Sequence, residues 1–397
     1  MADVGGTMTT DAARPQVFLH AGRDRRVQAG HPWAYSNEVR MTLEIKALAP
    51  GSVATLHRVD GKPLGVGTVN PHALIAFRVF DRAAGTAIDE DFLAERLTRA
   101  IALRERFYDQ PFYRLVHAES DGLPGLVIDR FGNVVVIQSN TAGMNRLLDP
   151  LLAAVLAVLA PAAIVLRNDG RTRAFEGLDT HVGIADGDVD GLVEVREGGL
   201  AFRADVIGGQ KTGWYFDQRD NRAFVAALAV EGRLLDAYCH TGGFAIAAAA
   251  AGARDVVGLD SSEAALAIAV ESAGLNGVAA RSDFRRADVF DALARLAADG
   301  ERFGVRRRRS ARLRPLQKEA VVGDQGLPQA RPPRRATGRA RRVSVHRLVL
   351  PQRRGRGLRH GGGHRPRPRR PFGPDHPRRR RRPRPSRAPP ASRNGLP

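Results

Sequence analysis

Three aspartates follow one another at the ends of strand-like segments in the second half of the chain. Asp236 lies in the apolar run LLDAY, Asp260 ends the run DVVGLD, and Asp288 ends a third such segment. In an open sheet of parallel strands, ligands bind outside the carboxyl ends of the strands, where these side chains would gather. A carboxylate after the second strand suits the two hydroxyls of a ribose, and one after the third could face an adenine amino group. The spacing therefore predicts a site for an adenosine-containing ligand.

The turn that follows the first of these strands, DAYCHTGGF, has features of a ligand-binding loop. Gly242 and Gly243 let the backbone pass close to a ligand, and N–H groups at the start of the next helix can receive a carboxylate or phosphate. The simpler alternative is that the glycine pair makes a tight turn and that lone acids cap helices. The turn lacks G-x-G-x-x-G, which argues against a dinucleotide, and we find nothing that resembles a P-loop.

These side chains need a parallel sheet to bring them together, and the hydrophobic pattern from residue 233 onward predicts one. Apolar strand-like runs alternate with helical patterns, and such alternation is typical of right-handed βαβ units. The predicted helices span residues 242–251, 262–275 and 290–298, and a fourth strand begins with FGV at 303–305. We therefore expect a Rossmann-like, doubly wound α/β domain that is incomplete, because the tail interrupts its fourth strand and the last strands are missing.

The segments before this domain predict two smaller units. Short strand-like runs broken by Gly and Pro come first and indicate a β-rich domain. An amphipathic helix, further strands, a helix over 145–159 and a hairpin signal at Gly198-Gly199 follow and indicate an α+β domain. The predicted boundaries are 16–90 for the β-rich domain, 91–217 for the α+β domain, 218–305 for the doubly wound domain and 306–397 for a tail.

Composition excludes several classes of protein. The chain of 397 residues is 43% hydrophobic, enough for a sizeable core, but it has no run of about 18 apolar residues that would cross a membrane. Its single cysteine excludes a disulfide framework and a cysteine-based zinc site, and no metal-ligand spacing appears. The N-terminus has no apolar secretory core. We expect a cytoplasmic protein with no membrane contact and no metal, and a homodimer stays an open alternative.

The net charge of +20 comes entirely from the last part of the chain. Residues 305–397 hold 30 Lys and Arg against 3 Asp and Glu, whereas residues 1–304 hold 32 against 39. This Arg/Pro-rich tail cannot bury a core, so its composition predicts disorder. One interpretation is a basic RNA-binding tail. We favour another, in which GC-rich coding DNA is translated out of frame from near Val305.

Shifting the frame by one base tests the second interpretation. With suitable wobble bases, residues 306–314 become VVADPPAF, which runs on directly from FGV. In the same register, residues 323–331 become GIKAYRKL, and residues 343–350 become FPFIASC. Three sensible segments in one register and in order favour the frameshift over a genuine basic tail.

The motifs also carry a specific resemblance. The sequence DAYCHTGGFAI, followed by GLDSS, resembles motif I and the next acid of class I methyltransferases that use S-adenosylmethionine (SAM). The segment GQKTGWYFDQRDNR at 209–222, GHPW at 30–33 and ESDGLPGL at 119–126 resemble rRNA large-subunit methyltransferases with an N-terminal PUA domain, mostly cytosine-5 enzymes. The similarity covers residues 16–305. It implies SAM as cofactor, 23S rRNA as partner, and a PUA-like, RNA-binding first domain.

The resemblance assigns residues to this chain position by position. Those expected around the cofactor are Asp217, Gln218, Asp236, Tyr238, Thr241, Gly242, Gly243, Phe244, Asp260 and Asp288. The methionine end would lie near Asp236, the ribose near Asp260 and the adenine near Asp288. In the first domain, charge and stacking predict RNA contacts. These candidates are Arg23, Arg25, Arg26, His31 and Trp33, although a solvated basic loop with Trp33 in the core is the alternative.

No catalytic residue of the resembled family is present in the chain as written. Methylation of cytosine C5 needs a thiolate that adds to C6 and a base that later removes the C5 proton. The family supplies the thiol from a Ser-Cys-Ser segment and holds the base with a DPP-Ala-Phe loop, and both occur only in the shifted frame. We interpret Cys239 as a small buried residue and His240 as a turn residue. The expectation is a SAM-dependent 23S rRNA methyltransferase, inactive as written. The alternatives are a guanine-N methyltransferase of the same family and a non-catalytic RNA-binding protein.

Overall fold

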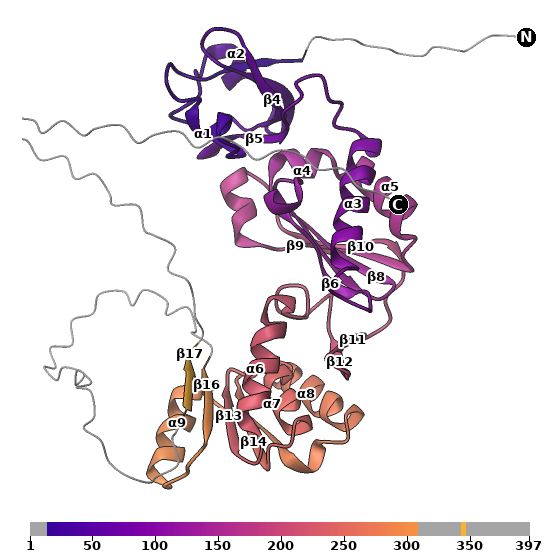
Figure 1. Ribbon diagram of the computed structural model, residues 1–397, viewed down its shortest axis with the longest axis vertical. Coiled ribbons are helices and arrows are strands. Elements are labelled where there is room, and N and C mark those ends of the chain that lie inside the picture. The colour runs from indigo at the N-terminus through magenta and orange to yellow at the C-terminus, as the bar shows by residue number, and fades with distance from the viewer. Residues whose placement is uncertain (1–13, 309–342, 347–397) are drawn as a thin grey trace, which may run out of the picture. The chain divides into compact units, whose positions relative to one another are not determined.

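The first domain is a five-stranded sheet that encloses its own small core. In the computed structural model (Figure 1), which describes residues 14–308 and 343–346, its strands follow the order β1-β3-β4-β5-β2. Alternate side chains such as Val17, Leu56 and Phe77 point inward and are fully buried. The elements are β1 (Gln16–Phe18), α1 (Arg25–Gln28), β2 (Trp33–Tyr35), α2 (Leu43–Lys46), β3 (Ser52–His57), β4 (Pro63–Val69) and β5 (Ile75–Asp81).

The second domain packs helices against one face of another five-stranded sheet. The strand order is β10-β9-β8-β7-β6, and only β8 and β9 pair in parallel. Leu93 and Leu97 of α3 pack with Leu151 of α5 and with the sheet in a single apolar cluster. The elements are α3 (Glu90–Arg104), β6 (Phe112–His117), η1 (Ala118–Asp121), β7 (Leu126–Phe131), β8 (Val134–Ser139), α4 (Ala142–Arg146), α5 (Leu148–Leu159), β9 (Ala163–Asn168), η2 (Arg171–Glu176) and β10 (His181–Gly187).

A β-hairpin leads from the second domain toward the third. Strands β11 (Val193–Glu197) and β12 (Leu200–Ala204) pair in antiparallel register around Gly198-Gly199. Both glycines have positive φ, 61° and 79°, as a two-residue hairpin turn requires. The hairpin predicted from these residues is therefore confirmed.

The third domain is a parallel sheet with helices on both faces, as predicted. Its order is β15-β14-β13-β16-β17. Leu234 and Val256 point to the face covered by α7 and α8, whereas Leu235 and Val257 point to the face covered by α9. The elements are η3 (Phe216–Gln218), α6 (Arg219–Ala229), β13 (Arg233–Ala237), α7 (Gly243–Ala250), β14 (Asp255–Asp260), α8 (Glu263–Leu275), η4 (Ala279–Arg281), β15 (Ser282–Arg286), α9 (Val289–Ala298), β16 (Val305–Arg308) and β17 (Val343–His346).

The parallel sheet of the third domain is more complete than the sequence pattern predicted. Strand β16 continues through Arg308 along β13, and β17 adds a fifth parallel strand that pairs Val343 with Val305. A backbone ladder satisfies the N–H and C=O groups along β13 whatever side chains the partner carries, so charged residues can join it. The predicted disorder covers residues 306–397, but residues 306–308 and 343–346 form these strands. The rest of the tail, residues 309–342 and 347–397, lies outside the described residues. Within the described part, no helix is long and apolar enough to cross a membrane.

Two glycines of the third domain give a matched test of its packing. A Cβ on Gly258 would lie 2.5 Å from Phe284 Cδ1 and 3.1 Å from Cys239 Sγ, whereas one on Gly274 would meet no atom within 4 Å. We predict that Gly258→Ala lowers the free energy of unfolding by about 1–3 kcal/mol through overpacking. Gly274→Ala, on the exposed side of α8, should raise it by about 0.5–1 kcal/mol. Urea denaturation of both variants measures the two effects, and equal stability of the two would contradict the packing argument.

Candidate functional site

The strand order places a crevice at the carboxyl ends of β13 and β16. The chain runs outward from β13 to β14 on one side and to β16 on the other, and ligands bind at such a switch point in α/β sheets. The loop that leaves β13 is held in an unusual backbone conformation, with φ of 60° at Tyr238, 54° at His240 and 75° at Gly242. Left-handed conformations at non-glycine residues cost about 1–3 kcal/mol and cluster at ligand clamps. The backbone conformation of this loop therefore makes it a candidate for ligand binding.

A small cavity opens beside this loop. Its volume is about 30 Å³, room for one or two water molecules. It is lined by Trp214, Tyr215, Gln218, Arg222, Tyr238, Cys239, His240, Thr241, Gly243, Phe244 and Arg307. Half of the residues expected around a cofactor are among them: Gln218, Tyr238, Thr241, Gly243 and Phe244.

Asp236 is fully buried and pairs with Arg307, a residue that lines the cavity. Its Oδ1 accepts a hydrogen bond of 2.7 Å from Nη1 of Arg307, the residue opposite it in the register of β13 and β16. Burial raises the pKa of the Asp236 carboxyl above its usual range, although Arg307 works against this shift. The carboxylate thus depends on a neighbouring cation for its charge.

Asp260 and Asp288 both accept hydrogen bonds from nearby backbone N–H groups. Asp260 accepts from the backbone N–H of His240 at 2.8 Å and of Ser262 at 3.0 Å, and so fixes the strained loop against β14. Asp288 lies two residues beyond β15 and caps α9, where its Oδ1 accepts from the N–H groups of Phe290 and Asp291. Asp288 therefore caps a helix, which is the alternative role considered for a lone acid. Binding of a cofactor by Asp260 or Asp288 stays a proposal.

The two glycines of the loop have different reasons to be glycine. Gly242 has positive φ, and a Cβ there would lie 2.9 Å from Ala269 Cβ and from Phe284 Cζ, so it serves the packing of α8 and β15. Gly243 faces the cavity, where a Cβ would lie 2.9 Å from Trp214 Cη2. The crowding atoms at both glycines belong to the chain itself, so close approach to a ligand stays a prediction for Gly243.

The wall opposite the loop comes from the segment 209–222. Trp214, Tyr215 and Arg222 line the cavity, and none of them was assigned a site role from the sequence. The sequence did hold a signal for them, because all three lie in GQKTGWYFDQRDNR. The family resemblance assigns only Asp217 and Gln218 of this segment to the cofactor site. Guanidinium Cζ of Arg222 lies 4.5 Å from the centroid of the Trp214 ring, so the two side chains form one rigid face.

This wall is fixed by buried polar contacts at both ends. Thr212 Oγ1 donates to Asp129 Oδ2 at 2.6 Å, and Asp129 also receives a bidentate pair from Arg114 at 2.8 and 2.9 Å. Glu197 of the hairpin receives Arg222 at 2.5 and 2.6 Å. The middle domain and hairpin therefore hold the segment that closes the cavity.

Asp217 lies near this wall but does not line the cavity. Burial acts to raise the pKa of its carboxyl, but Lys211, whose Nζ lies 3.7 Å from Asp217 Oδ1, the Gln218 amide and Arg114 together hold it below its usual range. The carboxylate is therefore charged at neutral pH.

The single cysteine has the environment of a core residue. Cys239 is 4% exposed, and burial, with Asp236 and Asp260 nearby, raises the pKa of its thiol far above the ordinary value. A thiol in this state supplies no thiolate at neutral pH. The His240 ring meets the Tyr215 ring edge-on, with centroids 5.4 Å apart.

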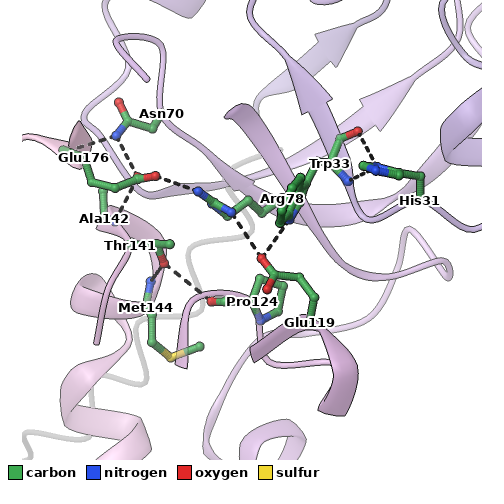
Figure 2. Close-up of polar contacts among 10 residues, drawn as sticks. All are labelled: His31, Trp33, Asn70, Arg78, Glu119, Pro124, Thr141, Ala142, Met144 and Glu176. Carbon is green, nitrogen blue, oxygen red and sulfur yellow. Dashed lines mark hydrogen bonds and ion pairs between the residues drawn. The ribbon is translucent and has the colours of Figure 1, made fainter. Parts of the chain in front are cut away.

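The candidate RNA-binding residues of the first domain separate into two groups. Arg23 and Arg25 are exposed, and Arg26 is exposed while it pairs with Glu38 at 2.9 Å. Trp33 is partly buried, and its Nε1 donates to Glu119 Oε1 of the second domain at 2.7 Å. Figure 2 shows His31 beside Trp33, where its Nδ1 receives the Trp33 backbone N–H.

A network of partly buried charges links the first two domains at this point. Arg78 of β5 pairs with Glu119 at 3.1 Å and with Glu176 at 2.8 Å (Figure 2). Glu176 also accepts from the amide of Asn70 and from the backbone N–H of Ala142. The segment ESDGLPGL, which resembles a signature of the methyltransferase family, thus contributes Glu119 to the contact between domains.

Within residues 14–308, no cluster of three or more His, Cys, Asp or Glu side chains is arranged to hold a metal ion.

Comparisons with known proteins agree with this architecture. The PUA-like domain family matches residues 17–82, and the S-adenosylmethionine-dependent methyltransferase family matches residues 168–303. Ribosomal RNA large subunit methyltransferase I of Shewanella denitrificans is 36% identical over 296 residues, which cover 73% of this chain and 74% of that protein. The protein of the same name from Klebsiella pneumoniae (strain 342) is 35% identical over 301 residues, 75% of each chain.

Two solved structures share the fold. A SAM-dependent methyltransferase from Streptococcus mutans superposes with a TM-score of 0.63 at 16% identity, covering 74% of this chain and 76% of that one. A methyltransferase in complex with S-adenosylhomocysteine gives 0.64 at 16% identity, with 74% and 75% covered.

The network of Figure 2 predicts a large effect of one arginine. Arg78→Met removes the cation between two carboxylates, of which Glu176 is 7% exposed, and should lower the free energy of unfolding by about 3 kcal/mol. Arg99→Met is the matched control, because Arg99 pairs with Glu95 on the exposed face of α3 and should cost less than about 0.5 kcal/mol. Guanidinium denaturation followed by Trp fluorescence compares them. A loss at Arg78 no larger than that at Arg99 would show that the network adds little stability.

The burial of Cys239 predicts an unreactive thiol. In native buffer at pH 8, Ellman's reagent should label it only at the rate of local or global opening, because the thiol is both covered and protonated. In guanidinium the same chain should release one equivalent rapidly, since it contains one cysteine. Rapid labelling of the folded protein would contradict the core assignment.

Proposed function

Because this chain belongs to the ribosomal RNA large subunit methyltransferase I family, we propose that it derives from an enzyme that methylates C5 of a cytosine in 23S rRNA. The fold and SAM-dependent methyltransferase class are those of the family. The observation that supports the site is the strained loop 238–242 at the switch point of the sheet, with Asp236 below it and Asp260 beside it. Ribosomal RNA as the substrate makes the cytoplasm the place of action.

The residues of the site fit one end of SAM better than the other. Asp260, at the end of β14, has further lone pairs for ribose hydroxyls, and Gly243 lines the cavity. At the amino-acid end, the Arg307 side chain already pairs with Asp236. When bound, SAM supplies an activated methyl group. The chain's own contribution is to hold the nucleoside and to exclude water behind the wall of Trp214 and Arg222.

We further propose that the chain as written cannot complete the reaction at cytosine C5. That reaction needs a thiolate to attack C6 of the base, and Cys239 is buried and protonated. The segments that would supply a nucleophile and a base-binding loop, FIASC and DPPAF, arise only when the frame is shifted by one base after Val305. A frameshift at this point explains both the loss of these segments and the Arg/Pro-rich composition that follows.

RNA binding is proposed for the first domain. Arg23, Arg25 and Arg26 give its surface three exposed guanidinium groups within four residues, suited to phosphates and base stacking. Trp33 and His31 are proposed to contact RNA beside these arginines, although the Trp33 ring is held at the domain contact by Glu119. A non-catalytic role in RNA binding is the second candidate function, favoured by these groups and the basic tail.

Methyl transfer to rRNA tests the proposal. Purified chain, 23S rRNA lacking the modification and tritiated SAM should give no labelling, whereas the chain expressed from the gene with one base deleted directly after the codon for Val305 should label the RNA. Replacing the cysteine of FIASC by serine in that second chain should abolish labelling, because the thiolate is lost.

Identification of the product separates the alternatives. Nucleoside mass spectrometry should find 5-methylcytidine, and a methylated guanine would support the guanine-N enzyme instead. Labelling by the chain as written would overturn its proposed inactivity. The sequence of the transcript across the codons for residues 303–311 decides whether the frame change is present in the cell.

A further inference from the structure

Arg307 lies at the heart of the site although it comes from the first residues of the basic segment. On β16 it faces Asp236 on β13, and its Nη1 donates to Asp236 Oδ1 at 2.7 Å and to the backbone oxygen of Tyr238 at 3.1 Å. Its Cζ lies 4.0 Å from the centroid of the Phe244 ring. The side chain is only 11% exposed, so the guanidinium is a fixed part of the cavity wall.

These contacts occupy the place where the amino-acid end of SAM is expected. Asp236, Tyr238 and Phe244 all belong to the turn assigned to that end, and Arg307 contacts each of them. The cavity beside these contacts is about 30 Å³, room for one or two water molecules. An incoming ammonium group would also compete with a guanidinium for one carboxylate, at a distance where like charges repel.

The other end of the site carries no such obstacle in its contacts. Asp260 is held by the backbone N–H groups of His240 and Ser262 on the β14 side of the loop. Its carboxylate keeps acceptor capacity for two ribose hydroxyls. The charge conflict is therefore confined to the amino-acid end.

We propose that Arg307 determines the specificity of this site by excluding ligands with an amino-acid tail and leaving it to adenine nucleosides that lack one. The inference rests on the proposed function, since it assumes that this crevice is the SAM site. With the wobble bases chosen above, the shifted frame places valine at position 307, a residue that lacks a cation and leaves Asp236 available. The chain as written would then lose SAM selectivity at the cofactor step as well as the later catalytic segments.

The test compares two ligands on the full chain by titration calorimetry. The probes are SAM and 5′-methylthioadenosine, which keeps the adenosine and the sulfur but has no amino-acid tail. The unaltered chain should bind 5′-methylthioadenosine at least about tenfold more tightly than SAM. Equal or tighter binding of SAM by the unaltered chain would overturn the proposal without any variant.

Substitutions then identify the residue responsible. Arg307→Val should tighten SAM binding at least about tenfold and leave 5′-methylthioadenosine within about twofold. Arg306→Val is the matched control, because Arg306 is the exposed neighbour on the same strand, and it should bind both probes like the unaltered chain. Arg307→Met, which keeps an unbranched chain but removes the charge, replaces the valine variant if loss of the Asp236 partner lowers its melting temperature below the assay range.

Three outcomes are distinct. Tighter SAM binding on substitution at 307 alone supports the proposal, and unchanged SAM binding with intact 5′-methylthioadenosine binding overturns it. Failure of every chain to bind 5′-methylthioadenosine would instead remove the cofactor-site assignment, and with it the proposed function.

Discussion

The carboxylate of Glu197 is the contact on which the geometry of the site most depends. It is 9% exposed and receives the Arg222 guanidinium in bidentate fashion, together with Arg219 Nε and Trp214 Nε1 at 3.3 and 3.4 Å. A buried carboxylate is costly without such donors, so the donors and the hairpin that carries it must stay together. Because Trp214 and Arg222 form one wall of the cavity, a residue of the hairpin fixes a wall of the third domain's site.

The same physical rule joins other segments that are far apart in sequence. Asp129 holds Thr212 and Arg114, and Glu176 holds Arg78 and Asn70 across the first two domains. In each case a carboxylate removed from water collects partners from several segments, because each unmet acceptor would cost about 1–3 kcal/mol. Between the second and third domains these polar contacts accompany a continuous apolar cluster, to which Phe131, Val165 and Leu234 all belong.

Charge balance at Asp236 sets a different kind of constraint. A fully buried carboxylate at the switch point requires a cation, and a SAM-type ligand brings one in its ammonium group. In this chain the Arg307 guanidinium from β16 supplies that cation without any ligand. The strained loop at 238–242 is thus retained around a site whose charge is already neutralised from within. The backbone of an α/β sheet can preserve a binding site's shape while one side chain changes the ligand it accepts.

Much of the architecture was determined by the sequence alone, because periodicity and turn chemistry are local. The hairpin at Gly198-Gly199, the alternation from residue 233 and the acids Asp236 and Asp260 were predictable in this way, as were their places at strand ends. What only the tertiary structure decided was which side chains meet. Trp33 contacts Glu119, Arg222 contacts Glu197, and Arg307 contacts Asp236 across 86, 25 and 71 positions. Strand order and register bring such pairs together, and neither can be read from the spacing of residues along a single chain.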